Sequence, residues 1–137
     1  MQSKLDTELI KKYLDTDYFI SDDPPLMLKI GEQNDDAKIL LASFNTNDGA
    51  FITAWNPRSA ILKDQENDDR QAALLAEIEM RHLNYLVGYG ERGDWREYSF
   101  FILGIGRECA SELAQQFEQN AYVWVDANGL PELVTMI

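Results

Sequence analysis

The chain has 137 residues, a formal net charge of −12, and 45% hydrophobic and 26% charged residues. This composition is that of an ordinary folded globular protein, and the length allows one core without metal or disulfide crosslinks. We therefore expect a single domain over residues 1–137. The excess of acidic residues should repel phosphate backbones, which argues against direct binding of duplex nucleic acid.

Cysteine content and the distribution of apolar residues predict a cytoplasmic protein. Cys109 is the single cysteine, so no internal disulfide can form. The first ten residues, MQSKLDTELI, lack the apolar segment of a signal peptide. Since no apolar run approaches the roughly 20 residues that cross a bilayer, we expect no membrane partner.

The first fifty residues predict a helix followed by a hairpin. Apolar side chains at helical spacing predict an amphipathic helix over residues 3–14. Acids, aromatics and two prolines at 15–25 predict a surface connection. Two short apolar runs, at 26–30 and 38–44, predict strands.

Six further elements follow in the order strand, helix, strand, strand, helix, strand. Strands are expected at 50–55, 84–90, 98–105 and 121–125, and helices at 67 to 82 or 83 and at 107–118. This is the split β-α-β-β-α-β order of ferredoxin-like folds. We therefore expect an α+β protein with a ferredoxin-like core over about 50–126, preceded by the helix and hairpin. LPELVTMI, at 130–137, should add an edge strand, where Pro131 is tolerated.

This topology predicts where polar residues gather. Right-handed crossovers and a central hairpin would place three polar connections at one edge of the sheet: Asn56–Arg70, Glu91–Glu97 and Gln119–Asn120. Connections presented by a rigid scaffold are common sites of function.

Four runs in these segments carry a resemblance: T-A-W-N-P-R-S at 53–59, E-N-x-x-R at 66–70, W-R-E-Y-S-F at 95–100 and F-E-Q-N-A-Y-V-W at 117–124. Together they resemble a small bacterial family catalogued only as a domain of unknown function, over roughly residues 50–126. The resemblance implies candidate site positions and no reaction. The candidates are Asn56, Ser59, Glu66, Asn67, Arg70, Trp95, Glu97, Ser99, Gln119 and Asn120.

The leading functional hypothesis is a non-catalytic binding module whose polar connections recognise a small ligand or a protein segment. Four arginines in or beside these connections could bind a planar or anionic molecule together with Trp95 and Tyr98. They are Arg58, Arg70, Arg92 and Arg96. The structural alternative is that they neutralise neighbouring acids, and that Arg70 ties two loops together.

Two other functions stay open. One is an enzyme with Glu66 or Glu97 as general base, in an ion-pair network with Arg70, and with Arg70 or Arg96 stabilising an anion. The other is an acidic inhibitor that mimics nucleic acid.

The sequence predicts neither a cofactor nor a metal. Acids cluster around Asp64–Asp69, but no Cys/His set or calcium-loop spacing accompanies them. The closing strand leaves an edge through which a homodimer could form.

Overall fold

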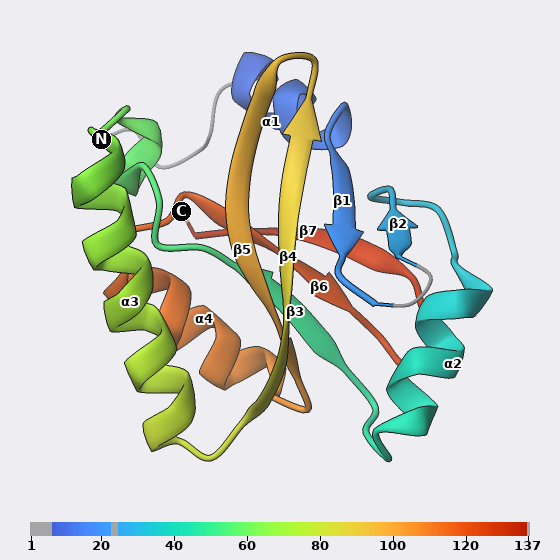
Figure 1. The fold of residues 1–137 in the computed structure, drawn as a ribbon. Helices are drawn as coiled ribbons and strands as arrows, with labels where there is room; N and C mark the ends of the chain where they lie inside the picture. Colours follow the sequence, from blue (N-terminus) through green and yellow to red (C-terminus); the bar gives the residue numbers. More distant parts are fainter. Residues whose placement is uncertain (1–6, 23–24, 137) are drawn as a thin grey trace.

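The computed structural model describes residues 7–22 and 25–136 (Figure 1). Residues 3–6 of the predicted first helix lie outside this range. The described helices are α1 (Thr7–Leu14), α2 (Asp35–Ser43), α3 (Asp64–Met80) and α4 (Arg107–Gln116), with a short 3-10 turn, η1 (Pro57–Ser59). The strands are β1 (Asp17–Ile20), β2 (Leu26–Leu28), β3 (Gly49–Ile52), β4 (Asn84–Arg92), β5 (Trp95–Leu103), β6 (Ala121–Val125) and β7 (Pro131–Thr135).

All seven described strands form one curled antiparallel sheet in the order β2-β1-β4-β5-β3-β6-β7. The mixed α+β class is confirmed. The β1–β2 hairpin extends the sheet beside β4, and β7 extends it beside β6 as the predicted edge strand. None of the described helices is long and apolar enough to cross a membrane.

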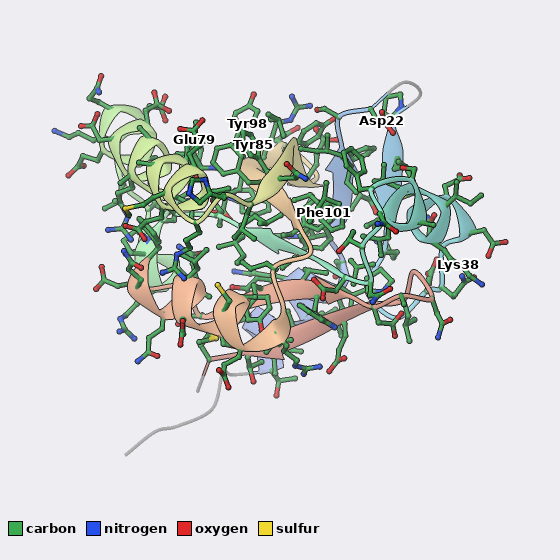
Figure 2. All side chains as sticks on the ribbon, turned by 90° about the horizontal axis from the view of Figure 1, so that it is seen from below. Asp22, Lys38, Glu79, Tyr85, Tyr98 and Phe101 are labelled. Atoms are coloured by element: carbon green, nitrogen blue, oxygen red, sulfur yellow. The ribbon has the colours of Figure 1, made fainter. Side chains whose placement is uncertain are left out.

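Alternating side chains give the sheet two hydrophobic faces. On one face, α3 and α4 cover a core that includes Ile52, Phe100 and Ile102. On the other, α2 covers a second core around Phe51 and Phe101. Figure 2, seen from below, shows α3 and α4 on one side of the sheet and α2 on the other. The two cores keep the central strands β3 and β5 rigid, and these strands lead directly into the site described below.

Backbone hydrogen bonds close the curl between the two ends of the sheet. The segment after β2 reaches the β6–β7 turn, where Gly31 N donates to Pro131 O at 2.9 Å and Asn34 N donates to Gly129 O at 2.9 Å. These bonds bring the two ends of the sheet together beside the start of α2.

The strand predicted at 38–44 is wrong, because this segment belongs to helix α2. Asn34 caps the helix by accepting a hydrogen bond from Ala37 N at 2.9 Å. Ala37, Leu40 and Leu41 fall on one buried helical face, whereas Ile39 is 64% exposed. The buried residues of this apolar run are therefore spaced as on one face of a helix, and not at every second position as in a strand.

The predicted hairpin between 26–30 and 38–44 does not form, and a hairpin of β1 and β2 takes its place. Its first strand is β1, within the segment predicted as a surface connection, and β2 is its second. The predicted loop at 91–97 is also mostly strand, because β4 runs to Arg92 and β5 begins at Trp95. Trp95 and Glu97 are therefore held by a strand ladder and not by a loop.

The remaining boundaries differ less. β6 spans the predicted 121–125, and α4 buries Ala110, Leu113 and Ala114 as predicted. Helix α3 begins three residues before the predicted Asn67, at Asp64.

Candidate functional site

A pocket of about 230 Å³ opens at the end of the sheet where α1 meets the β4–β5 turn. Figure 1 shows α1 and this turn together at the top of the molecule. The first wall is α1, the second is the loop after β3, the third is the β4–β5 hairpin, and the fourth is the segment after α4. The lining residues are Leu9, Lys12, Tyr13, Thr16, Asn56, Ser59, Ile61, Arg92, Trp95, Glu97 and Gln119.

A second cavity of about 40 Å³ lies beside the pocket and shares Tyr13, Trp95, Glu97 and Gln119 with it. It extends to Tyr18 and to the buried Ser99 in the interior of the curl. The two cavities together run from an open mouth towards the core that α2 covers.

Asn56 is fixed by Asn67, which is only 2% exposed. Asn67 Oδ1 accepts from Asn56 N at 2.9 Å, and Asn67 Nδ2 donates to Asn56 Oδ1 at 3.0 Å. Asn56 Oδ1 also accepts from Leu62 N at 3.0 Å. Because the oxygen of the Asn56 amide is held in this way, its Nδ2 faces Glu97 and donates to Glu97 Oε2 at 3.3 Å.

Glu97 is the acidic group of the pocket. Burial raises the pKa of Glu97 from 4.5 to about 7, although the hydrogen bond from Asn56 acts in the opposite direction. Neither Lys12 nor Arg92 contributes to this shift. Among the described residues, no ion pair joins Glu97 to either cation, although all three side chains line the same pocket.

Two tyrosines beside Glu97 stay neutral. Burial raises the pKa of Tyr13 to about 12, and the charge of Glu97 adds to this effect. The pKa of Tyr18 is also raised, first by burial and then by Tyr13 and Glu97. Ser59 beside Tyr13 and Thr16 beside Tyr18 act in the opposite direction and lower these pKa values less than burial raises them. The inner part of the pocket therefore presents neutral hydroxyl and amide groups around one carboxyl that titrates near neutrality.

The segment after α4 is tied to the same site. Gln119 Nε2 donates to Trp55 O at 3.0 Å and to Phe117 O at 3.2 Å. Asn120 Nδ2 donates to Ser59 Oγ at 2.9 Å. Through Ser59, Asn120 supports the pocket without lining it.

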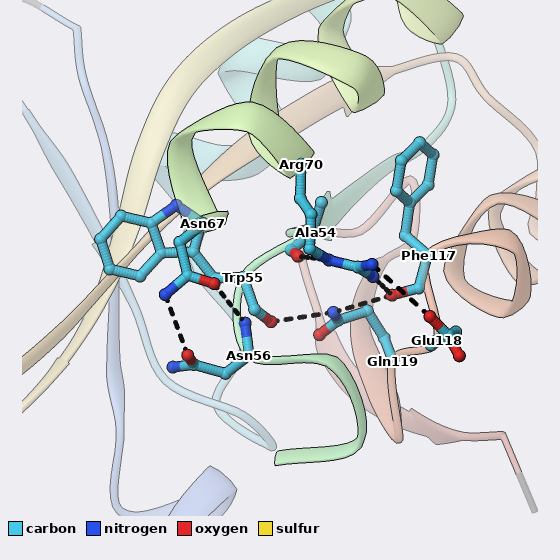
Figure 3. Close-up of polar contacts among 8 residues, drawn as sticks. All are labelled: Ala54, Trp55, Asn56, Asn67, Arg70, Phe117, Glu118 and Gln119. Carbon is cyan, nitrogen blue, oxygen red and sulfur yellow. Dashed lines mark hydrogen bonds and ion pairs between the residues drawn. The ribbon is translucent and has the colours of Figure 1, made fainter. Parts of the chain in front are cut away.

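Arg70 joins the loop after β3 to the end of α4 (Figure 3). Its Nε donates to Ala54 O at 2.7 Å, its Nη2 donates to Phe117 O at 2.6 Å, and its Nη1 lies 3.5 Å from Glu118 Oε1. These contacts match the structural alternative considered for Arg70 from the sequence. They position the walls of the pocket, and they leave Arg70 outside its lining.

Left-handed backbone conformations gather in the same loops. Among the described residues, six other than glycine have a positive φ, and four of them are Asn56, Arg58, Ser59 and Glu118. Each such conformation costs about 1–2 kcal/mol for a residue with a side chain. Arg58 N donates to Glu118 O at 2.7 Å, which links the two strained segments. Strain of this kind is often retained where a site needs a particular shape.

The proposed ion-pair network of Glu66, Arg70 and Glu97 does not form. Glu66 is exposed and accepts from Lys63 N at 3.2 Å at the start of α3. Arg70 pairs with Glu118, and Glu97 bonds with Asn56. Arg96 pairs with Glu91 at 2.7 Å, lies over the ring of Tyr89, and is not among the residues that line the pocket.

The structure thus brings most of the predicted positions together. Asn56, Ser59, Trp95, Glu97 and Gln119 line the pocket, and Ser99 lines the inner cavity. Asn67, Arg70 and Asn120 hold its walls. Glu66 is the exception. In the described part of the chain, no group of three or more His, Cys, Asp or Glu side chains could hold a metal ion.

The contribution of α1 was missed by reasoning from the sequence. Leu9, Lys12 and Tyr13 of α1, with Thr16 just after the helix, form one wall of the pocket. Their helical spacing identifies a helix, but it does not identify what that helix covers. The exposed Ile61, with 87% of its surface accessible, was missed as well. An apolar residue in a polar loop was the available signal.

The sequence profile of a family described as protein of unknown function (DUF3293) matches residues 52–122, which is more than half of the chain. Neither the search of curated proteins nor the search of solved structures found a significant match. The matched segment includes three walls of the pocket, and α1 lies outside it. The predicted resemblance to a domain of unknown function is confirmed: the chain belongs to the DUF3293 family.

Proposed function

We propose that this protein is a binding module that holds one small organic molecule in the pocket between α1 and the β4–β5 hairpin. The observation that supports the proposal most is the convergence of four separate segments on one concave space of about 230 Å³. A concave pocket with apolar walls and a few convergent polar groups is the usual form of a small-molecule site.

The chemistry of the walls supports a small-molecule ligand. Trp95 is 39% exposed and Ile61 is 87% exposed, so apolar surface is available at the mouth of the pocket. Asn56 and Gln119 offer oriented amides, and Glu97 is held by a hydrogen bond at the inner end. Stacking on the indole would supply affinity, while the polar groups would supply orientation.

A thermal shift screen of single-ring and short-chain metabolites tests the proposal. A ligand at about a hundred times its dissociation constant should add roughly 2.7 kcal/mol of stability, which raises Tm by several degrees. We expect the shift to be abolished in Trp95→Ala and reduced in Glu97→Gln, because both side chains line the pocket.

Two variants outside the pocket serve as controls. Trp124→Phe changes an indole on β6, and Glu132→Gln removes an exposed carboxylate that pairs with Arg107. Both should retain the shift. Ligands that stabilise the Trp95 and Glu97 variants as strongly as the unmodified protein would show that the site lies elsewhere.

A second candidate, an enzyme with Glu97 as general acid or base, is supported by the raised pKa of this carboxyl. A group with a pKa near the operating pH can both take up and release a proton. Arg92, which lines the pocket, replaces Arg70 and Arg96 as the cation of this hypothesis. The expected signature is a Glu97→Gln variant that still binds a ligand but no longer converts it. Equal conversion by both proteins would remove the candidate.

We also propose that residues 50–126 form a ferredoxin-like core within a single domain. The order β4-β5-β3-β6, with α3 and α4 on one face, supports this assignment. Agreement between calorimetric and van't Hoff enthalpies of unfolding would support one cooperative unit. Two separate transitions would contradict the single domain. The acidic inhibitor remains a prediction from net charge.

A further inference from the structure

We infer that the ligand of this pocket is a small organic anion: one carboxylate or similar group on a body no larger than a single substituted ring, with the anionic end between Lys12 and Arg92. The inference rests on the proposed function, and it names the chemical class that the site would accept.

The volume of the pocket limits the size of the ligand. A dry cavity of about 150 Å³ is known to hold benzene, whereas drug-sized ligands occupy pockets of roughly 300–1,000 Å³. The pocket, at about 230 Å³, lies between these values. It therefore accommodates one ring with one or two substituents, and it is too small to enclose a dinucleotide or an oligosaccharide.

The distribution of ion pairs in the protein indicates the charge of the ligand. Acidic residues outnumber Lys and Arg by 24 to 12, so carboxylates are in excess over cations. Arg70, Arg81, Arg96 and Arg107 each form an ion pair. Among the described residues, Arg58 and Arg92 are the two arginines for which no ion pair is found. Arg92 lines the pocket, and Arg58 lies in the loop that forms its second wall.

Lys12 adds a second cation to the lining, and it too has no carboxylate partner among the residues described. Guanidinium and ammonium groups that face a concave space bind carboxylates through charge-assisted hydrogen bonds. The one carboxyl in the lining, Glu97, bonds with Asn56 and forms no ion pair with Lys12 or Arg92 among the described residues. Without an ion-pair partner in the lining, Lys12 and Arg92 are available to a ligand.

The side chains at the inner end of the pocket indicate which other polar group the ligand carries. Tyr13, Ser59, Gln119 and the carboxyl of Glu97 are groups that exchange hydrogen bonds with a hydroxyl or carbonyl. Trp95 and Tyr13 provide the ring faces for the body. An anion with a polar group on its far side would satisfy both ends.

A charge series on one ring tests the inference. We would titrate the full chain with 4-hydroxybenzoate, 4-hydroxybenzamide and 4-hydroxybenzylamine at pH 7.5 and low salt, using amide and indole chemical shifts. The benzoate should bind at least about tenfold more tightly than the amide, since its charge-assisted bonds are roughly twice as strong as neutral ones. The amine should bind least.

Charge-removal variants locate the contact. Lys12→Gln and Arg92→Gln should each weaken benzoate binding about tenfold and weaken binding of the amide much less. Lys38→Gln, on the exposed face of α2, and Arg107→Gln should leave the affinity for benzoate unchanged. Equal effects of the pocket and control variants would overturn the inference.

The result also separates the inference from the proposed function. If the amide or amine binds as tightly as the benzoate, with Trp95 shifted, the anionic class is wrong and the small-molecule site stands. If neither this series nor a general library of single-ring fragments shifts Trp95 or the amides around Glu97, both proposals are wrong.

Discussion

The buried carboxyl of Glu97 lowers the stability of the protein when it is ionised, and it is also the acidic group of the pocket. Burial beside α1 raises its pKa to about 7, and Asn56 supplies only one hydrogen bond to the carboxyl. The titratable and charged side chains around it are Lys12, Tyr13, Tyr18 and Arg92, and none of them lowers its pKa. The native state therefore holds a proton that the unfolded chain releases.

Glu97→Gln should make the protein more stable at alkaline pH than at acidic pH, relative to the unmodified chain. From pH 4.5 to about 7 the native carboxyl stays protonated while the unfolded one ionises, so the free energy of unfolding falls as pH rises. The substitution removes this loss, for a relative gain of about 1–3 kcal/mol at pH 8. Urea unfolding at pH 4, 6 and 8 measures the difference. A gain that is the same at all three pH values would contradict the raised pKa.

Asn67→Ala should destabilise the protein by about 2–3 kcal/mol, because it removes the buried Asn67 amide and one partner each from the side chain and backbone N–H of the half-buried Asn56. Asn128→Ala, in the exposed β6–β7 turn, is the matched control, with an expected change below about 0.5 kcal/mol. Denaturant unfolding compares the two. If both variants lose equally little, Asn67 does not hold the loop.

At the scale of elements, α1 is the least anchored wall of the pocket. It has eight residues and none of them is fully buried. Helices this short are marginal without tertiary packing. In contrast, β3 is buried throughout, and it is paired on both sides.

Hydrogen exchange should therefore be fast in α1 and slow in β3 and β5. Regions with few buried contacts open at low free energy, whereas central strands open near the global limit. A ligand in the pocket should slow exchange of α1 amides around Tyr13 more than those of α2. Mass spectrometry of exchange on peptides measures both regions. Protection of α1 equal to that of β3 without ligand would contradict this account.

The sequence predicted elements well where their burial pattern was local. In α4, Ala110, Leu113 and Ala114 repeat at helical spacing, and all three are buried. Residues 38–44 failed because a run of apolar residues fits a strand and a helix equally well, and the deciding signal was the Asn34 cap before it. β1 was missed because Pro24 and Pro25 follow it closely, although a strand can end before them.

The site was predicted in part for a similar reason. A βαββαβ order is enough to bring Asn56, Glu97 and Gln119 to one end of a sheet. Hydrogen-bond partners are not determined by order, so the ion-pair network expected for Arg70 was replaced by bonds to backbone carbonyls. The position of α1 depends on how β1 joins the sheet, which no local pattern reveals.

At the scale of the whole molecule, the curl of the sheet depends on Gly129. Its φ is +79°, and a Cβ there would meet Asn34 O and Lys38 N at the start of α2. Gly93, in the β4–β5 turn, has a φ of +61° and open space around it. Both glycines therefore have a positive φ, but only Gly129 has neighbouring atoms that a side chain would meet.

Gly129→Ala should consequently cost more stability than Gly93→Ala. Both substitutions incur about 1–2 kcal/mol of backbone strain, and only the first also forces the β6–β7 turn away from α2. We expect an additional loss of about 1–3 kcal/mol, with a larger fall in Tm by calorimetry. Equal losses would show that the closure between Gly129 and Asn34 is dispensable.

The most direct test of the proposed binding site is the indole N–H signal of Trp95 during titration with single-ring anions. Trp95 lines the pocket, whereas Trp124 lies on β6 outside it and serves as an internal reference. The account predicts a saturable shift of the Trp95 signal, with the Trp124 signal unmoved and the affinity about tenfold weaker in Arg92→Gln. Saturable binding that leaves the Trp95 signal in place would contradict a small-molecule site in this pocket.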